Sequence, residues 1–322
     1  MNNSPLLEVK DVHVWFPVRR GLFSRVHNYV RAVQGVSLQI GVGEVVGLVG
    51  ESGCGKSTLA RSIMQLEPPH RGTINLVGKD IYKLGTNEAR AIRRDVQIVF
   101  QDPYASLNPR MPVYQIITEG LIAHRIIAPV EQESVARELL SDVGMSADVM
   151  YRYPHEFSGG QRQRISIARA LSMKPKLIVC DEAVSALDVS IQAQVINLLM
   201  ELKSKYNLSY LFISHDLGVV KYIADRIAVM YLGRIVEQGK CEEVMAHPRH
   251  PYTQALLAAI PVAGGPRQAT KPLSGEMPSV ANPPPGCPFH TRCPKVMPIC
   301  REKYPDTRVE SGAEVSCHLY GK

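Results

Sequence analysis

The chain has 322 residues, of which 45% are hydrophobic and 21% charged, and its net charge is +7. This composition is globular rather than disordered, and the length suffices for one large domain with an appendage. No apolar run reaches the roughly 18 to 20 residues of a membrane span, and the N-terminus lacks a signal-peptide pattern, so we expect a cytosolic chain without a transmembrane segment. Lysine and arginine are dispersed, which favours a solvated basic surface over a nucleic-acid groove.

Four short apolar runs bounded by turn residues predict buried strands, at 44–50, 96–100, 177–181 and 210–214. None of them alternates polar with apolar residues, as is typical of parallel strands covered on both faces. Helical patterns separate the runs, so the sequence predicts an α/β fold with a mainly parallel sheet. The stretch from about 102 to 172 is expected to form a helical subdomain.

One of these helices is predicted within 131–144, and it is expected to end at Gly144. Its apolar residues fall on one face: Val135, Leu139, Leu140 and Val143.

A phosphate-binding loop follows the first of these strands and precedes an apolar helix. Its sequence is GESGCGKST: Gly50, Glu51, Ser52, Gly53, Cys54, Gly55, Lys56, Ser57 and Thr58. The glycines let backbone N–H groups turn toward phosphate oxygens, and the helix N-terminus adds positive potential. In this pattern Lys56 reaches the β- and γ-phosphates of ATP and Ser57 ligates Mg²⁺.

Two carboxylates, Asp181 and Glu182, stand where the 177–181 run ends, and His215 follows the 210–214 run. Ligands bind at the carboxyl ends of parallel strands, so these side chains are expected at one sheet edge. Asp181 is predicted to hold the metal, Glu182 to polarise the attacking water and His215 to contact the γ-phosphate. The alternative for His215 is a structural role.

A second glycine pair lies about a hundred residues after the first loop, in FSGGQRQR at 157–164. Ser158 suits the N-cap of the helix that follows, whose positive end favours an anion. The chain thus carries two places suited to phosphate.

The motif order GESGCGKST, FQDP, SGGQ, LIVCDE, SALD and SHD resembles the nucleotide-binding domains of ABC transporters over about residues 6 to 245. The resemblance implies that Gln101 couples nucleotide state to membrane subunits and joins the Mg²⁺ site, and that Ser185–Asp188 crosses a dimer interface. Phe157 replaces a usual leucine and Ala183 a frequent proline. Neither residue performs chemistry, so we expect a competent ATPase.

The resemblance also explains the second glycine pair. It implies that the SGGQ segment caps ATP held by a second subunit, so that hydrolysis separates two chains that share each nucleotide. The residues concerned are Ser158, Gly159, Gly160 and Gln161. The family's adenine-stacking aromatic corresponds to Phe16, with core packing as the alternative. Trp15 stands beside it, and Tyr29 follows the stretch RRGLFSRVHN at 19–28, which looks like an insertion.

The composition changes near residue 246, since 13 of the 23 prolines follow it. Such proline density excludes long helices and central strands, so we expect a small, loop-rich appendage at 246–322 that opens with a short helix. HPYT at 250–253, FQDPYASLNPRM, the N-terminal insertion at 17–33 and the tail resemble the second ATPase subunit of dipeptide/oligopeptide importers.

This branch implies a related ATPase, two membrane permeases and an extracytoplasmic substrate-binding protein as partners, at the cytoplasmic face of the membrane and without nucleic acid. Relatives carry dipeptides, oligopeptides, nickel chelates or glutathione, and the sequence does not choose among these cargoes. The alternative from a different functional class is a soluble ABC ATPase acting on nucleic acid. The uninterrupted single domain and the HPYT tail weigh against it.

Four of the seven cysteines lie in the tail: Cys287, Cys293, Cys300 and Cys317. Structural disulfides are not expected in the cytosol, so four thiols within about 30 residues indicate metal. Thiolate-only ligation suits an iron–sulfur cluster or zinc, and the resemblance favours a [4Fe–4S] cluster. His290 or His318 could substitute in a zinc site, and four unliganded thiols are the remaining alternative. Cys54, Cys180 and Cys241 are not expected to be ligands.

Overall fold

The computed structural model describes residues 4–20, 25–260 and 275–321. By their contacts the residues divide into two compact units. The first unit comprises Met1–Leu6, Ile40–Glu44 and Lys83–Ile213, and the second comprises Leu7–Gln39, Val45–Tyr82 and Ser214–Lys322. Among the described residues, no helix combines the length and the apolar character needed to cross a bilayer.

Parallel strands form the sheet of the first unit, in the order β8 (Ser209–Ser214), β7 (Leu177–Asp181) and β6 (Val96–Val99). All three were predicted from their apolar runs, and the bounds agree within one residue. β8 is buried at every position, as expected for a parallel strand covered on both faces. Asp181 pairs with Ile213 in the last register of β7, so the acidic residue stands at the carboxyl end of this sheet.

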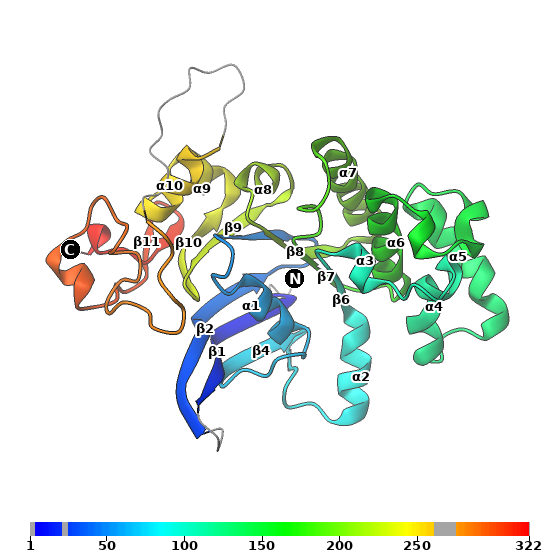
Figure 1. The fold of residues 1–322 in the computed structure, drawn as a ribbon, viewed down its shortest axis with the longest axis horizontal. Coiled ribbons are helices and arrows are strands. Elements are labelled where there is room, and N and C mark those ends of the chain that lie inside the picture. Colours follow the sequence, from blue (N-terminus) through cyan, green and yellow to red (C-terminus); the bar gives the residue numbers. More distant parts are fainter. Residues whose placement is uncertain (1–3, 21–24, 261–274, 322) are drawn as a thin grey trace. The chain divides into compact units, whose positions relative to one another are not determined.

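Helices of this unit occupy much of the stretch from 102 to 172, where the sequence predicts a helical subdomain. Its α-helices are α2 (Thr86–Asp95), α3 (Pro103–Ser106), α4 (Val113–Ala123), α5 (Gln132–Asp142), α6 (Gly159–Ser172) and α7 (Val189–Tyr206). Its short 3₁₀ helices are η1 (Pro129–Glu131), η2 (Ala147–Tyr151) and η3 (Pro154–Glu156). α4, α5 and α6 pack against one another, as Figure 1 shows in green.

The predicted amphipathic helix corresponds to α5. Leu140 and the following Val143 are buried, and the chain then turns at Gly144 with a positive φ of 68°. Val135 and Leu139 were expected on the same face, but they are only half-buried. Both line a groove of about 530 Å³ between helices of this unit.

The second unit contains an antiparallel sheet in the order β2-β1-β4-β5. Its strands are β1 (Leu7–Arg20), β2 (Arg25–Ile40), β4 (Arg71–Leu76) and β5 (Lys79–Asp80). The end of β1 and the first part of β2 belong to the N-terminal insertion at 17–33, of which residues 21–24 lie outside the described residues. The long alternating strands explain why this region lacks the continuous apolar runs used to predict the parallel strands.

The other strands of the second unit follow the order β11-β12-β10-β9-β3. They are β3 (Val45–Val49), β9 (Arg226–Tyr231), β10 (Arg234–Lys240), β11 (Arg308–Glu310) and β12 (Ala313–Val315). β3, which is the strand predicted at 44–50, is entirely buried and runs parallel to β9. β9, β10, β12 and β11 pair antiparallel, so the strand arrangement is mixed rather than parallel throughout.

Short helices complete the second unit. They are α1 (Lys56–Ile63), α8 (Leu217–Ile223), α9 (Cys241–Ala246), α10 (Pro251–Ala258), η4 (Pro298–Arg301) and η5 (His318–Tyr320). α10 is the helix expected at the start of the proline-rich tail. The tail also adds two three-residue strands at the edge of β10, a position that tolerates the surrounding prolines.

Candidate functional site

The phosphate loop connects β3 to α1, as its sequence predicted. A Cβ atom at Gly50 would lie 2.2 Å from the carbonyl oxygen of Met230, and one at Gly55 would lie 2.2 Å from that of Ala32. Gly55 also has a φ of 109° and precedes α1 as its N-cap without a side-chain cap. Only glycine fits both the backbone conformation and the close approach. The N-terminal N–H groups of α1 follow directly after the loop.

Lys56 lies inside this loop and is only 4% exposed. Its Nζ donates to the carbonyl oxygens of Gly50, at 2.7 Å, and Glu51, at 3.0 Å. The ammonium group is therefore held on the loop's own carbonyls. Burial raises the pKa of the Cys54 thiol, so this cysteine stays protonated and is not a reactive nucleophile.

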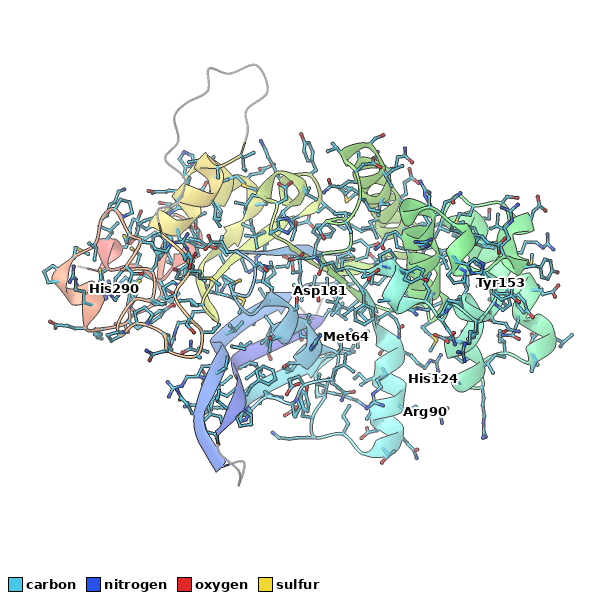
Figure 2. The ribbon with its side chains drawn as sticks, in the orientation of Figure 1. Met64, Arg90, His124, Tyr153, Asp181 and His290 are labelled. Carbon is cyan, nitrogen blue, oxygen red and sulfur yellow. The ribbon has the colours of Figure 1, made fainter. Side chains whose placement is uncertain are left out.

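A polar cluster in the first unit joins three residues of different motifs. Gln101 Nε2 donates to Glu182 Oε2 at 3.0 Å and to Ser185 Oγ at 3.4 Å. Ser185 Oγ in turn donates to the carbonyl oxygen of Glu182 at 3.0 Å. Asp181, labelled in Figure 2, immediately precedes this cluster at the end of β7.

Glu182 has a positive φ of 50°, an uncommon conformation for a residue with a side chain. Its N–H donates to the carbonyl oxygen of Ile213 at 3.0 Å, so the backbone is fixed where it leaves the sheet. Strained backbone of this kind is concentrated at functional sites. Ser185 was predicted only as part of the dimer-interface loop, since its contact with Gln101 spans 84 positions of sequence.

His215 follows β8 and belongs to the second unit. Its side chain is exposed, and the next residue, Asp216, caps α8 by accepting from the N–H of Gly218 at 2.7 Å. The turn around His215 is thus held by its neighbours, which leaves the imidazole at the surface of this unit.

The SGGQ segment begins α6, and Ser158 is its N-cap as expected. Gln161 N–H donates to Ser158 Oγ at 3.4 Å, and Ser158 N–H donates to Gln161 Oε1 at 3.0 Å, which completes a capping box. A Cβ atom at Gly160 would lie 2.4 Å from Ile191 Cγ2, whereas one at Gly159 would have ordinary contact distances. Gly160 is therefore required by packing against α7.

The aromatic residues near the N-terminus face opposite sides of β1. Phe16 is half-buried and shares its face with the buried Val14. Trp15 lies on the other face, where its ring stacks on that of His70 with centroids 5.6 Å apart and lies 6.2 Å from that of Tyr29. Arg31 approaches the same indole, at 5.4 Å from its centroid. The aromatic cluster thus forms around Trp15, and no contact of this kind involves Phe16 within the described residues.

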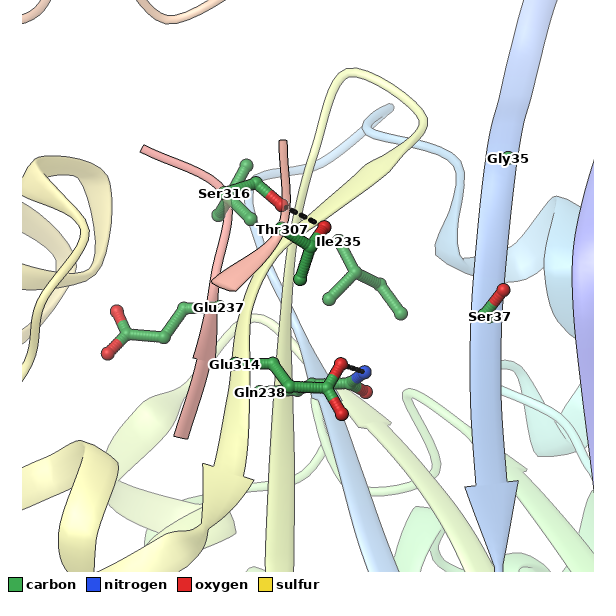
Figure 3. A pocket seen from close by; sticks show the side chains of 9 residues that line it. Gly35, Ser37, Ile235, Glu237, Gln238, Thr307, Glu314 and Ser316 are labelled. Carbon is green, nitrogen blue, oxygen red and sulfur yellow. Dashed lines mark hydrogen bonds between the residues drawn. The ribbon is translucent and has the colours of Figure 1, made fainter. Parts of the chain in front are cut away.

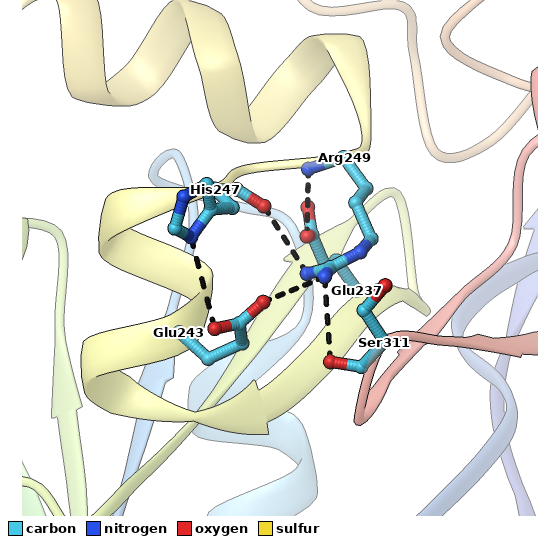
Figure 4. A network of polar contacts seen from close by, with 5 residues as sticks. All are labelled: Glu237, Glu243, His247, Arg249 and Ser311. Atoms are coloured by element: carbon cyan, nitrogen blue, oxygen red, sulfur yellow. Dashed lines mark hydrogen bonds and ion pairs between the residues drawn. The ribbon is translucent and has the colours of Figure 1, made fainter.

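The HPYT segment is anchored by a buried carboxylate, Glu237 of β10 (Figure 4). Its oxygens accept from the N–H groups of Arg249 and His250 at 2.8 and 2.9 Å. Arg249 also pairs with Glu243 of α9 at 2.7 Å. Burial raises the pKa of Glu237 despite these hydrogen bonds. No local pattern indicated this residue, because its partners lie 12 and 13 positions away.

The four tail cysteines lie close enough together for the charge of each to affect the thiol of Cys287. Cys287 and Cys300 are each 8% exposed, and the N–H of Cys287 donates to the carbonyl oxygen of Cys300 at 2.8 Å. Burial, together with the charges of the other three cysteines, raises the pKa of the Cys287 thiol to about 11. Across the described residues, no three or more His, Cys, Asp or Glu side chains are grouped closely enough to hold a metal ion.

A small polar pocket of about 110 Å³ opens between β2, β10 and the tail strands (Figure 3). Gln238 Nε2 donates to Glu314 Oε2 at 2.7 Å, and the hydroxyls of Thr307 and Ser316 lie 2.8 Å apart. The space has room for a few water molecules, at about 30 Å³ each. It contains none of the predicted nucleotide-binding residues.

Residues 33–185 match the family described as ABC transporter, and residues 236–300 match the one described as oligopeptide/dipeptide transporter, C-terminal region. Among curated proteins, the chain is 51% identical to the oligopeptide transport ATP-binding protein AppF of Bacillus subtilis, over 99% of this chain and 98% of the relative. It is 48% identical to OppF of Salmonella typhimurium, over 97% and 95%, and 46% identical to the dipeptide transport ATP-binding protein DppF of Escherichia coli, over 97% and 94%.

Solved structures with the same fold include cbiO1 of Clostridium perfringens, part of the ABC transporter complex cbiONQ. It has a TM-score of 0.64 and 28% identity, over 76% of this chain and 92% of the other. A dimeric ATP-binding cassette in a post-hydrolysis state, bound to ADP and phosphate, also has a TM-score of 0.64, with 27% identity over 73% and 98% of the two chains. The chain therefore resembles known proteins in sequence over 99% of its length and in fold over 76%.

Proposed function

Because the chain belongs to the ABC transporter ATP-binding proteins that carry an oligopeptide/dipeptide C-terminal region, we propose that it is the ATP-hydrolysing motor subunit of a peptide importer. ATP and Mg²⁺ are the cofactors of this family. The subunit acts at the cytoplasmic face of the membrane. Its partners are a related ATPase, two permeases and an extracytoplasmic substrate-binding protein.

The observation that carries this proposal is the loop geometry around Lys56. A buried ammonium group, three glycines and the start of α1 converge between a buried strand and a helix, which is the arrangement that binds a nucleoside triphosphate. Lys56 then binds the β- and γ-phosphates, Ser57 and Asp181 hold Mg²⁺, and Gln101 completes the metal site. His215 contacts the γ-phosphate.

We assign Glu182 as the residue that polarises the attacking water. Its carboxylate accepts from Gln101 at 3.0 Å, so a conformational change at Gln101 can alter the orientation of the base. Ser158, Gly159 and Gly160 donate to the γ-phosphate held by a facing subunit, with Gln161 completing the capping box. The dimeric post-hydrolysis cassette of similar fold supports a two-subunit reaction. Adenine stacks on an aromatic residue near the N-terminus. By resemblance to the family this residue is Phe16, and the nearby cluster of Trp15 and Tyr29 is the alternative.

Replacing Glu182 with Gln tests the assignment. We expect MgATP hydrolysis to fall by about a hundredfold or more, because a general base contributes on the order of 10² to 10⁴ in rate, while the dissociation constant for ATP stays unchanged. Glu201→Gln, on an exposed position of α7, is the matched control and should keep the original rate. Hydrolysis at the original rate in Glu182→Gln would contradict the assignment.

The cargo is tested in cells of the source organism. With Glu182→Gln as the only change, uptake of radiolabelled dipeptides and oligopeptides should be lost while the protein level is unchanged, and Glu201→Gln should transport normally. The names of the relatives, which are oligopeptide and dipeptide transport proteins, support peptides as cargo. Normal peptide uptake with impaired uptake of nickel chelates or glutathione would instead identify another substrate of the same machinery.

We further propose that the tail cysteines bind an iron–sulfur cluster. Four thiols with no carboxylate among them match the donor set of such a cluster. Zinc held by the same thiols is the alternative. Bound iron would also lower the raised pKa of the Cys287 thiol by favouring the thiolate.

Anaerobic purification followed by iron and acid-labile sulfide analysis tests the cluster. The unaltered chain should contain about four irons and four sulfides, and Cys300→Ser should lose most of both. Cys241→Ser is the matched control, because Cys241 is buried outside the tail and should leave the content unchanged. Stoichiometric zinc in place of iron would overturn the cluster in favour of the alternative metal, and neither metal would leave the thiols unliganded.

A further inference from the structure

The cysteine-containing tail makes a direct ion pair with the phosphate loop. Arg292 Nη1 donates to Glu51 Oε2 at 2.6 Å, and Nη2 donates to Glu51 Oε1 at 3.0 Å. The arginine side chain is 4% exposed and that of Glu51 is 30% exposed. A bidentate guanidinium–carboxylate pair with a buried guanidinium is among the stronger polar contacts in proteins and fixes the orientation of both groups.

The start of the tail makes a second contact with the same residue. The backbone N–H of Glu51 donates to the hydroxyl oxygen of Tyr252 at 2.9 Å. Tyr252 belongs to α10, in the HPYT segment, and is completely buried. Its hydroxyl therefore holds the backbone of the loop at the residue whose side chain Arg292 holds.

Glu51 in turn positions the lysine of the phosphate loop. Its carbonyl oxygen accepts from Lys56 Nζ at 3.0 Å and from the N–H of Cys54 at 3.3 Å. A displacement of Glu51 would consequently move an oxygen that orients the ammonium group. The carboxylate of Glu51 also places a negative charge on the loop that binds the polyphosphate, and Arg292 offsets this charge.

The position of Arg292 depends on the loop between the first two tail cysteines, Cys287 and Cys293. The N–H of Arg292 donates to the carbonyl oxygen of Phe289 at 3.0 Å. Phe289 is buried and its ring packs against those of Tyr231 and Tyr252, with centroids 5.2 and 5.4 Å away. Aromatic packing thus connects this loop to the hydroxyl that binds Glu51.

We propose that Arg292 and Tyr252 are positioning residues for ATP binding, through which the cysteine-containing tail sets the affinity of the phosphate loop. Arg292 neutralises Glu51 and holds its side chain, while Tyr252 holds its backbone. The inference rests on the proposed nucleotide-binding function of the loop. It assigns to the tail an effect on this chain's own nucleotide site, in addition to any metal that the tail binds.

ATP titration of the purified full-length chain tests the proposal. We expect Arg292→Met to raise the dissociation constant for ATP about tenfold, as for the loss of a bidentate charge-assisted contact, and Tyr252→Phe to raise it about threefold. Arg292→Lys, which retains the charge but not the bidentate geometry, should fall between Arg292→Met and the unaltered chain. Arg301→Met is the matched control, because Arg301 is an exposed arginine adjacent to another tail cysteine, and it should leave the affinity unchanged.

The double variant Glu51→Gln/Arg292→Met separates positioning from structural damage. Removing the unpaired carboxylate should restore part of the affinity lost in Arg292→Met, whereas general damage to the fold would be at least as severe in the double variant. Thermal unfolding without nucleotide checks that each variant folds. Equal affinity in Arg292→Met, Arg301→Met and the unaltered chain would overturn the inference alone. Failure of the unaltered chain to bind ATP would overturn the proposed function itself.

Discussion

At Gly160 the packing of α6 against the start of α7 leaves no room for a side chain. A Cβ atom there would lie 2.4 Å from the Cγ2 methyl of Ile191, and this β-branched side chain on a helix has little freedom to move away. At Gly159 the closest atom to such a Cβ, Leu187 Cδ2, is 3.6 Å away, which is an ordinary contact. The two glycines of the SGGQ segment therefore have different physical reasons to be glycine.

Replacing Gly160 with Ala should lower the free energy of unfolding by about 1 to 3 kcal/mol, because the added methyl group overpacks the contact with Ile191. Gly159→Ala should change it by less than about 1 kcal/mol, and chemical denaturation monitored by circular dichroism compares the two. The double variant Gly160→Ala/Ile191→Ala should recover part of the loss. Equal destabilisation by the two single variants would contradict the packing account.

Sequence patterns select the candidate site residues but do not predict their contacts. GESGCGKST, LIVCDE and SGGQ are local patterns, so the residues of Gly50–Thr58, Asp181 and Glu182 could be selected without coordinates. The contact of Arg292 with Glu51 spans 241 positions and leaves no local trace, since an arginine between two cysteines equally suits a solvated loop. Phe16 was selected from the family's register, while the structure gathers its aromatic rings around Trp15.

At the scale of elements, α10 begins at a histidine that acts as its N-cap. His250 Nδ1 accepts from the N–H of Tyr252 at 3.0 Å, which requires a neutral imidazole with an unprotonated Nδ1. Burial lowers the pKa of His250 from 6.5 to about 3. The buried carboxylate Glu237 faces the backbone N–H of the same residue, and burial raises its own pKa.

This cap should make the protein less stable as the solution is acidified. The unfolded chain protonates His250 below about pH 6.5 and the folded chain does not, so stability present above that pH is lost as the pH falls toward 3. The loss from pH 7 to pH 5 should be about 2 kcal/mol. His250→Asn keeps a capping oxygen without a titrating group and should remove this part of the slope.

Denaturant unfolding at a series of pH values measures the effect. Glu237 contributes with the opposite sign, since a raised carboxyl pKa favours the fold at lower pH, and the comparison between variants isolates the histidine. His247→Asn, on a side chain that is 72% exposed, is the matched control and should retain the slope of the unaltered chain. An unchanged slope in His250→Asn would show that the neutral cap does not govern acid stability.

Strands were predicted correctly where burial on both faces of the sheet makes the apolar run in the sequence continuous. β3, β6, β7 and β8 were found in this way, and the capping box of α6 was anticipated from Ser158. β11 and β12 were not predicted, because strands of three residues carry almost no periodicity. β12 pairs with β10 through residues 76 and 78 positions apart, and β11 pairs with β12, so tertiary contacts rather than local propensity decide both strands.

At the scale of the whole molecule, the chain carries a phosphate loop and an SGGQ segment in different compact units. In the proposed mechanism these segments do not act on the same nucleotide, because SGGQ completes the site of a facing subunit. In the proposed importer the specificity for cargo lies in other chains, which is why neither the sequence nor the fold of this one selects a particular peptide. This chain then contributes the coupling of ATP binding and hydrolysis to association.

If each ATP site is shared between two subunits, two inactive variants should regain activity when they are mixed. Lys56→Ala removes the phosphate-binding ammonium but keeps SGGQ, whereas Ser158→Arg places a bulky cation in SGGQ but keeps the phosphate loop. Each variant alone should hydrolyse ATP at least about a hundredfold more slowly than the unaltered chain, since preorganised donors of this kind are worth on the order of 10² to 10³ in rate.

An equimolar mixture should regain a substantial part of the rate, because a mixed dimer contains one intact loop opposite one intact SGGQ segment. The measurement is phosphate release at total chain concentrations high enough for association, and the activity of the mixture should rise more steeply than in proportion to concentration. A mixture of Lys56→Ala with the double variant Lys56→Ala/Ser158→Arg is the control and has no intact pair. If the first mixture is no more active than this control, two copies of this chain do not complete one another's sites, and the same measurement with the related ATPase present then tests whether the shared site forms in the heterodimer.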